Sequence, residues 1–110
     1  MKIGKKRQGN IVIVTIQGRF DATTAPLFEQ EVMPMLDAGD KSFLLDLARL
    51  DYVSSAALRH LLTLARKAED KGGRVALLSM QSQILEIFDL AGFTQLFHVY
   101  TDREEALRSF

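Results

Sequence analysis

The sequence predicts a single α/β domain, residues 1–110, built on a mainly parallel sheet. Short apolar segments rich in β-branched residues, such as residues 11–16, alternate with longer segments of helical periodicity. Because parallel strands need crossover connections, this alternation favours a β-β-α-β-α-β-α-β-α order with about five strands and helices packed on one side. The 110 residues, 47% of them hydrophobic, are enough for one core.

The expected strands are short and apolar. The first carries Lys5, Lys6 and Arg7, which suit an exposed edge, and it pairs antiparallel with the second through a turn at Gly9 and Asn10. The expected strands are residues 1–7, 11–16, 43–47, 74–78 and 96–100.

The expected helices carry apolar residues on one face. The first begins near Thr24, whose hydroxyl can cap it, has Pro26 in its first turn, and should be kinked at Pro34 and end by Gly39. The other helices are expected from Ser55 to the Gly72–Gly73 pair, around residues 84–88 up to Gly92, and from a capping box of Thr101 and Glu104 onward.

Composition excludes several classes of function. Lys plus Arg and Asp plus Glu both total 14, so no overall field attracts nucleic acid or an anionic membrane. The chain has no cysteine, which removes disulfides and thiol catalysis. No apolar run reaches the ~18 residues typical of a membrane span. We therefore expect a soluble, cytoplasmic protein that neither crosses a membrane nor binds nucleic acid directly.

Motifs of catalysis are also missing. Neither Ser54 nor Ser55 sits in a G-x-S-x-G turn, and the chain contains no P-loop or G-x-G-x-x-G segment. His60 and His98 have no second ligand at metal-binding spacing. We expect no catalytic residue, no metal site and no cofactor.

Two loops at the carboxyl ends of strands are chemically distinctive, residues 18–24 and 50–57. The second ends in Ser54 and Ser55 at the start of a helix, where backbone N–H groups and the helix dipole favour a phosphate. The alternative is that one serine simply caps the helix, and capping and modification can coexist.

Two carboxylates accompany these loops. Asp21 precedes the first helix, so it either caps that helix or faces the two serines if their strands are neighbours. Asp46 ends an apolar strand, which suggests a hydrogen-bonded carboxylate near the same loops or a brace for one of them.

Nearly the whole chain resembles the STAS domain, named for sulphate transporters and anti-sigma-factor antagonists. Residues 18–21 (GRFD), with Thr24 and Ala25, are similar to the family's G-x-L-D-x-x-T-A segment. Residues 44–58 are similar to its apolar-D-L-x-x-L-x-x-[I/V]-D-S-[S/T]-G-L segment, and Gly92–Phe93 resembles a turn before the family's last strand.

The resemblance implies that Ser55 is the phosphorylated residue, with Ser54 as second choice. Ser54 stands where the motif has an aspartate, and Ala57 replaces a glycine that lets a partner's backbone approach. The implied partner-binding residues are Asp21, Thr24, Ser54, Ser55, Ala57 and Arg59, with Asp46 as a structural residue nearby.

The resemblance also implies a function. It indicates a non-catalytic anti-sigma-factor antagonist that sequesters an anti-sigma factor with serine-kinase activity and so regulates transcription. Phosphorylation would switch it off and a PP2C-type phosphatase would switch it on, with ATP bound by the kinase. The alternative is a constitutive, non-phosphorylated STAS subunit of a transporter or sensory complex, which the alanine at position 57 favours.

Overall fold

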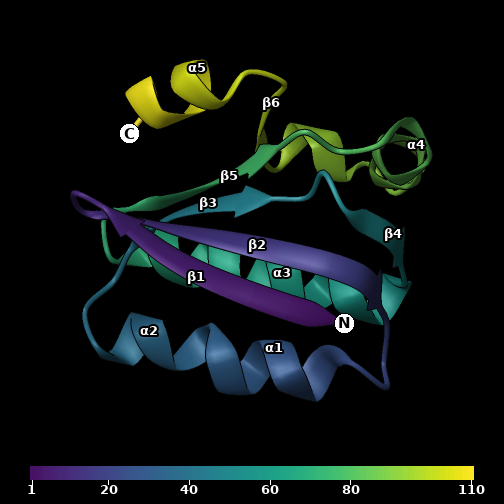
Figure 1. The fold of residues 1–110 in the computed structure, drawn as a ribbon, viewed down its shortest axis with the longest axis horizontal. Helices are drawn as coiled ribbons and strands as arrows, with labels where there is room; N and C mark the ends of the chain where they lie inside the picture. Colours follow the sequence, from purple (N-terminus) through teal and green to yellow (C-terminus); the bar gives the residue numbers. More distant parts are fainter.

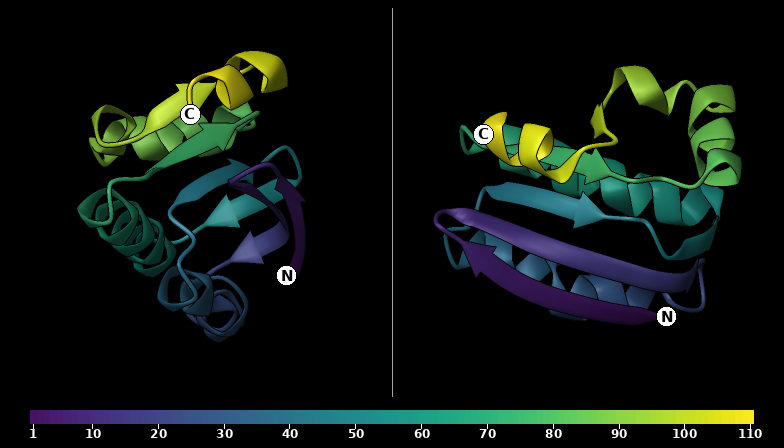
Figure 2. Two further views of the ribbon diagram at one scale, coloured as in Figure 1. Left: turned by 90° about the vertical axis from the view of Figure 1, so that its left-hand side faces the viewer. Right: turned by 45° about the horizontal axis from the view of Figure 1, so that its top comes forward.

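The computed structural model describes residues 1–110 as a six-stranded sheet with helices on both faces (Figures 1 and 2). The strands run in the order β1-β2-β3-β5-β6, and β4 pairs with β2. Only β1 is antiparallel to its neighbour. The strands are β1 (Lys2–Gln8), β2 (Ile11–Phe20), β3 (Ser42–Asp46), β4 (Leu50–Val53), β5 (Arg74–Leu78) and β6 (His98–Tyr100).

The fold class and the predicted alternation of strands and helices are confirmed. A short extra strand, β4, was not expected, because it has only four residues and its middle two are exposed. None of the helices combines the length and apolar character needed to cross a bilayer. The helices are α1 (Ala25–Glu31), α2 (Met33–Asp37), α3 (Ser55–Asp70), α4 (Ser82–Leu90), the 3-10 helix η1 (Phe93–Gln95) and α5 (Arg103–Arg108).

The main core lies between one face of the sheet and helices α1 to α4. Alternate residues of β2, Val12, Val14 and Ile16, point into it, as the pleat of a strand requires. Phe28 from α1 and Phe88 from α4 fill it from the helix side, and both are fully buried.

The expectation of helices on one side only is wrong, because α5 covers the opposite face (Figure 2). There Ile13, Leu44, Ala76 and Leu78 form a smaller buried cluster under Ala106 of α5. The apolar runs in β2, β3 and β5 are therefore continuous because the middle of the sheet is buried on both faces.

Polar contacts hold α5 on this second face. Arg103 Nη2 lies 2.7 Å from Asp46 Oδ2, which ties the helix to the end of β3. Arg74 Nη1 donates to the carbonyl oxygen of Ser109 at 2.7 Å, and its guanidinium lies over the ring of Phe110.

Edge strand β1 is exposed along most of its length and is joined by ion pairs to α1 and to the connection between α2 and β3. Lys5 Nζ lies 2.8 Å from Glu31 Oε2. Arg7 donates to both carboxylate oxygens of Asp40, at 2.6 and 2.7 Å, and holds the pKa of Asp40 below its ordinary value.

The predicted break at Pro34 is confirmed, since α1 ends at Glu31 and Pro34 lies in the first turn of α2. The predicted Thr24 cap is wrong. Thr24 Oγ1 instead donates to the carbonyl oxygen of Arg19 at 2.9 Å and accepts from the N–H of Asp21.

The predicted capping box of Thr101 and Glu104 is also wrong. The residue before α5 is Asp102, and no side-chain cap hydrogen bond forms there. The helix begins one residue later than expected, so Thr101 and Glu104 do not occupy the two positions that a capping box requires.

Gly73 lies in the connection between α3 and β5, directly beside Lys41, the residue before β3. Its N–H donates to the carbonyl oxygen of Ala68 at 2.8 Å, and the next N–H, of Arg74, donates to that of Lys41. A Cβ atom at Gly73 would overlap the Lys41 carbonyl group, which cannot move without breaking the β3–β5 pairing.

We expect Gly73→Ala to lower the free energy of unfolding by about 3 kcal/mol, at the upper end of overpacking costs, because the clash is with backbone. Urea unfolding followed by far-UV circular dichroism measures this. Gly4→Ala is the matched control, since its Cβ would lie 3.8 Å from Thr15 Cβ, an ordinary contact. Equal unfolding midpoints for the two variants would contradict the prediction.

Candidate functional site

The two segments predicted as loops lie side by side, but they are partly regular structure, since residues 18–20 end β2, residues 50–53 form β4 and residues 55–57 begin α3. β2 pairs in parallel with β4, placing Phe20 opposite Val53, and the N–H of Ser54 donates to the carbonyl oxygen of Phe20 at 3.0 Å. Asp21, which follows Phe20, is therefore brought next to Ser54. We call the surface formed by residues 19–24 and 51–59 the rim.

A β-bulge sets the register that creates the rim. Gly18 pairs with Leu50, but the next pair is Arg19 with Tyr52, so Asp51 is left over. Gly18 has a φ of 98°, which favours glycine, and its N–H donates to the Arg49 carbonyl oxygen at 2.9 Å. Bulges of this kind redirect the side chains that follow them.

The two serines have different environments. Ser54 is the N-cap of α3, and its Oγ accepts from the N–H of Ala57 at 3.1 Å. Ser55 is the first residue of α3 and is exposed, and its hydroxyl has no hydrogen-bond partner in the chain. The positive end of the helix dipole lies at this point. The available hydroxyl is therefore that of Ser55.

Asp21 supplies a fixed negative charge. Its Oδ1 accepts from Thr23 Oγ1 at 2.7 Å and from the N–H groups of Thr23 and Thr24 at 3.0 and 3.2 Å. These hydrogen bonds, above all the one from the Thr23 hydroxyl, and the nearby Arg19 hold the pKa of Asp21 below its ordinary value. The predicted role of Asp21 as the cap of α1 is wrong, because the N–H groups that it binds precede the helix.

Arg19 and Tyr52 form a pair that sequence reasoning missed. The Arg19 Cζ atom lies 4.3 Å from the centre of the Tyr52 ring, a cation–π contact. Arg19 Nε lies 3.7 Å from Asp21 Oδ2. Both side chains are exposed at the rim, and no local pattern in either segment indicates that they meet.

Ala57 requires a correction. Its side chain is fully buried in the main core, so it cannot contact a partner. The sequence pattern placed it two residues after the exposed serine but gave no indication of which way its methyl group points. The alanine therefore leaves the accessible surface of the rim unchanged.

The remaining predicted residues have distinct positions. Arg59 is exposed on α3, one turn after Ser55, and Thr24 uses its hydroxyl within its own loop. Asp46 lies at the end of β3, where Oδ1 accepts from the N–H of Ala48 at 3.1 Å and Oδ2 pairs with Arg103. Asp46 thus braces the turn that leads to β4 and holds α5.

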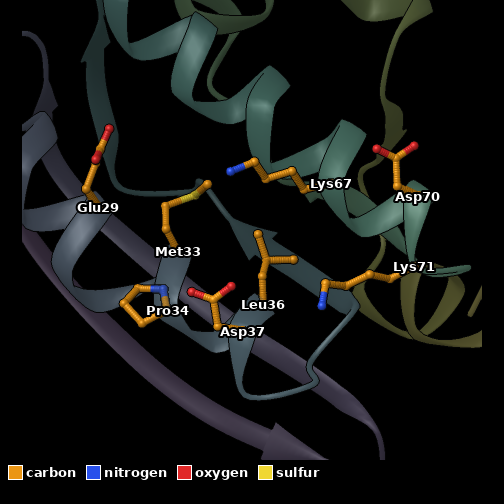
Figure 3. Close-up of a pocket in the computed structure, with 8 residues that line it drawn as sticks. All are labelled: Glu29, Met33, Pro34, Leu36, Asp37, Lys67, Asp70 and Lys71. Atoms are coloured by element: carbon orange, nitrogen blue, oxygen red, sulfur yellow. The ribbon is translucent and has the colours of Figure 1, made fainter.

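The hollows in the surface lie away from the serines. The one in Figure 3, of about 510 Å³, lies between α2 and the carboxyl-terminal end of α3. Its charged lining is mixed, with the carboxylates of Glu29, Asp37 and Asp70 and the amines of Lys67 and Lys71. The 16 residues of α3 place that end roughly 22 Å from Ser55. Neither serine lines any hollow, and Ala22 is the one rim residue that does, in a hollow between α1 and His60.

The chain is similar to known proteins along nearly its whole length. The STAS domain family matches residues 2–106. BtrV of Bordetella bronchiseptica, a proposed anti-sigma factor antagonist, is 33% identical over 110 residues, which are 100% of this chain and 95% of BtrV.

Two solved structures share the fold. TM1081 of Thermotoga maritima, another proposed anti-sigma factor antagonist, has a TM-score of 0.92 at 20% identity, covering 97% of this chain and 92% of that chain. Phosphorylated SpoIIAA, a Bacillus cell fate determinant, has a TM-score of 0.77 at 17% identity and covers 98% of both chains. The chain belongs to the STAS domain family, among the anti-sigma-factor antagonists.

Proposed function

We propose that this chain binds an anti-sigma factor with serine-kinase activity through the rim, and that phosphorylation of Ser55 weakens the binding. Sequestering the anti-sigma factor frees a sigma factor, and a PP2C-type phosphatase restores the active form. One observation carries the proposal: Ser55 presents an exposed hydroxyl with no partner in the chain, while Ser54 beside it is occupied as a cap.

The environment of Ser55 favours it over Ser54 as the modified residue. A kinase needs a hydroxyl that is free to react, and modifying Ser54 would first break a cap worth about 0.5–2 kcal/mol. At Ser55 a phosphate would meet free N–H groups and the helix dipole, an interaction worth roughly 0.3–1 kcal/mol when exposed. The folded domain should therefore tolerate the modification.

The same phosphate would oppose a bound partner. It adds about −1.5 to −2 charges at pH 7 to a surface on which Asp21 is already ionised. In a docked complex these charges lose part of their hydration, and like charges in an interface cost several kcal/mol. Binding would thus respond to phosphorylation while stability would not.

The names of the relatives, and the two forms in which one of them has been solved, support this proposal. BtrV and TM1081 are described as anti-sigma factor antagonists, and SpoIIAA has been solved in both phosphorylated and unphosphorylated forms. The alanine at position 57, which had favoured a constitutive subunit, no longer does so because it is buried.

We also propose that the chain itself is not an enzyme. Ser55 has no hydrogen bond to a general base, and the polar contacts of Asp21 are with Thr23, Thr24 and Arg19. ATP would be bound by the partner kinase, so the chain needs no cofactor. Both proposed partners act in the cytoplasm, where we place the function.

Phosphorylation of Ser55 should weaken partner binding about tenfold or more, because at least ~1.4 kcal/mol of repulsion is expected at the rim. The test incubates the purified chain with the kinase-type anti-sigma factor of the same genome and ATP, and locates the phosphate by mass spectrometry. Titration calorimetry then compares wild type, phosphoprotein, Ser55→Asp and Ser55→Ala.

Ser55→Ala should escape modification and bind as wild type does, which makes it the matched control. Phosphate on Ser54 alone would move the assignment by one residue. No phosphorylation, together with wild-type binding by Ser55→Asp, would refute the switch.

Ser54→Ala should lower the free energy of unfolding by about 1 kcal/mol, because the N–H of Ala57 loses its cap. Ser55 should remain a kinase substrate in this variant. Urea unfolding measures the free energy of unfolding, and mass spectrometry detects phosphorylation of Ser55. Ser55→Ala, which breaks no hydrogen bond, should shift stability by less than about 0.5 kcal/mol. Equal losses of unfolding free energy in Ser54→Ala and Ser55→Ala would contradict the assignment of the helix cap to Ser54 alone.

A further inference from the structure

Arg19 and Tyr52 are the largest exposed side chains at the pairing of β2 and β4. The Arg19 side chain is 64% exposed and Tyr52 is 37% exposed, although the residues that follow them, Phe20 and Val53, are buried. Arginine and tyrosine are among the residue types that carry most of the binding energy in protein interfaces. The bulge at Gly18 is what brings these two together on one strand pair.

The two side chains are already in contact in the unbound chain. The Arg19 guanidinium lies over the Tyr52 ring at 4.3 Å and is oriented from one side by Asp21. A free arginine loses rotamer freedom when it binds, and ordering it in advance reduces that cost.

The binding capacity of Arg19 is unused. Asp21 reaches only Nε, at 3.7 Å, and neither terminal nitrogen of Arg19 has a hydrogen-bond or ion-pair partner. The two terminal nitrogens of a guanidinium form a planar fork that matches a carboxylate. The geometry therefore favours a carboxylate, with an apolar side chain next to it that can lie against the remaining surface of the Tyr52 ring.

We propose that Arg19 and Tyr52 determine which anti-sigma factor this chain binds, by holding a carboxylate and a neighbouring apolar side chain of that protein. This rests on the proposed function. Arg19 and Tyr52 occupy positions that the STAS motifs, matched here by residues 18–21 and 44–58, leave open to any residue. The pair is therefore a feature of this chain and not of the shared motif.

The proposal also accounts for the direction of the switch. A carboxylate held by Arg19 would lie on the same rim as Ser55, because Tyr52 is three residues before Ser55 and pairs with Arg19. A phosphate on Ser55 would repel that carboxylate. One acidic group on the partner would thus be attracted to the unmodified chain and repelled by the phosphorylated one.

The test uses the purified kinase-type anti-sigma factor of the same genome as the probe and measures its dissociation constant by calorimetry. Arg19→Ala should raise that constant about thirtyfold, the scale of an interface hot spot, and should reduce its dependence on salt. Arg19→Lys should recover only part of the loss, since lysine keeps the charge but not the fork. Tyr52→Phe should bind within about threefold of wild type and Tyr52→Ala should lose about tenfold or more.

Lys6→Ala is the matched control, because it removes the same charge from an exposed position on β1, away from the rim. Melting by circular dichroism should show the same stability for the Arg19 variants and wild type. Charge reversal in Arg19→Glu should be rescued by changing one acidic residue of the anti-sigma factor to lysine, which would identify the carboxylate.

The outcomes separate the two proposals. If the anti-sigma factor does not bind the wild-type chain, the proposed function fails. If it binds and is lost with Ser55→Asp, but Arg19→Ala binds as tightly as wild type, only the specificity proposal is overturned. A loss of affinity in Arg19→Ala with an unchanged salt dependence would also overturn it, because Arg19 would then act without contacting a charge.

Discussion

The parallel pairing of β2 with β4 determines the geometry of the rim. Phe20 and Val53 lie opposite each other in this pairing, and both are buried. Phe20 also packs against Phe28 of α1, with ring centroids 5.0 Å apart, so a slip of one residue would turn it out of the core. The burial of one phenylalanine side chain therefore holds Asp21, the next residue, beside Ser54.

The first turn of α3 places surface chemistry and core packing within four residues. Ser54 closes the helix end, Ser55 faces solvent, and Ala57 fills the core. Residues with such different environments can be changed separately, because the packing of Ala57 does not depend on the group attached to Ser55. A chemical change at Ser55 therefore leaves the packing of the rest of the domain undisturbed.

Local patterns in the sequence predicted most of the fold, but not the features that depend on distant neighbours. The sequence did not predict that α5 covers the second face of the sheet. The signal was present, because Ile13 and Leu44 lie in continuous apolar runs of the kind found in strands buried on both faces. Asp21 and the two serines could be chosen as site residues because loops after parallel strands meet at one edge. The contact of Arg19 with Tyr52 could not be predicted, since it exists only in the register that the bulge creates.

The charge of edge strand β1 affects how two copies of the chain can associate. Joining two sheets through β1 would bring the unpaired cations of two strands together, Lys2 and Lys6 from each molecule. Repulsion between these cations disfavours association through β1, so this edge of the sheet is protected against pairing with a second copy of the chain.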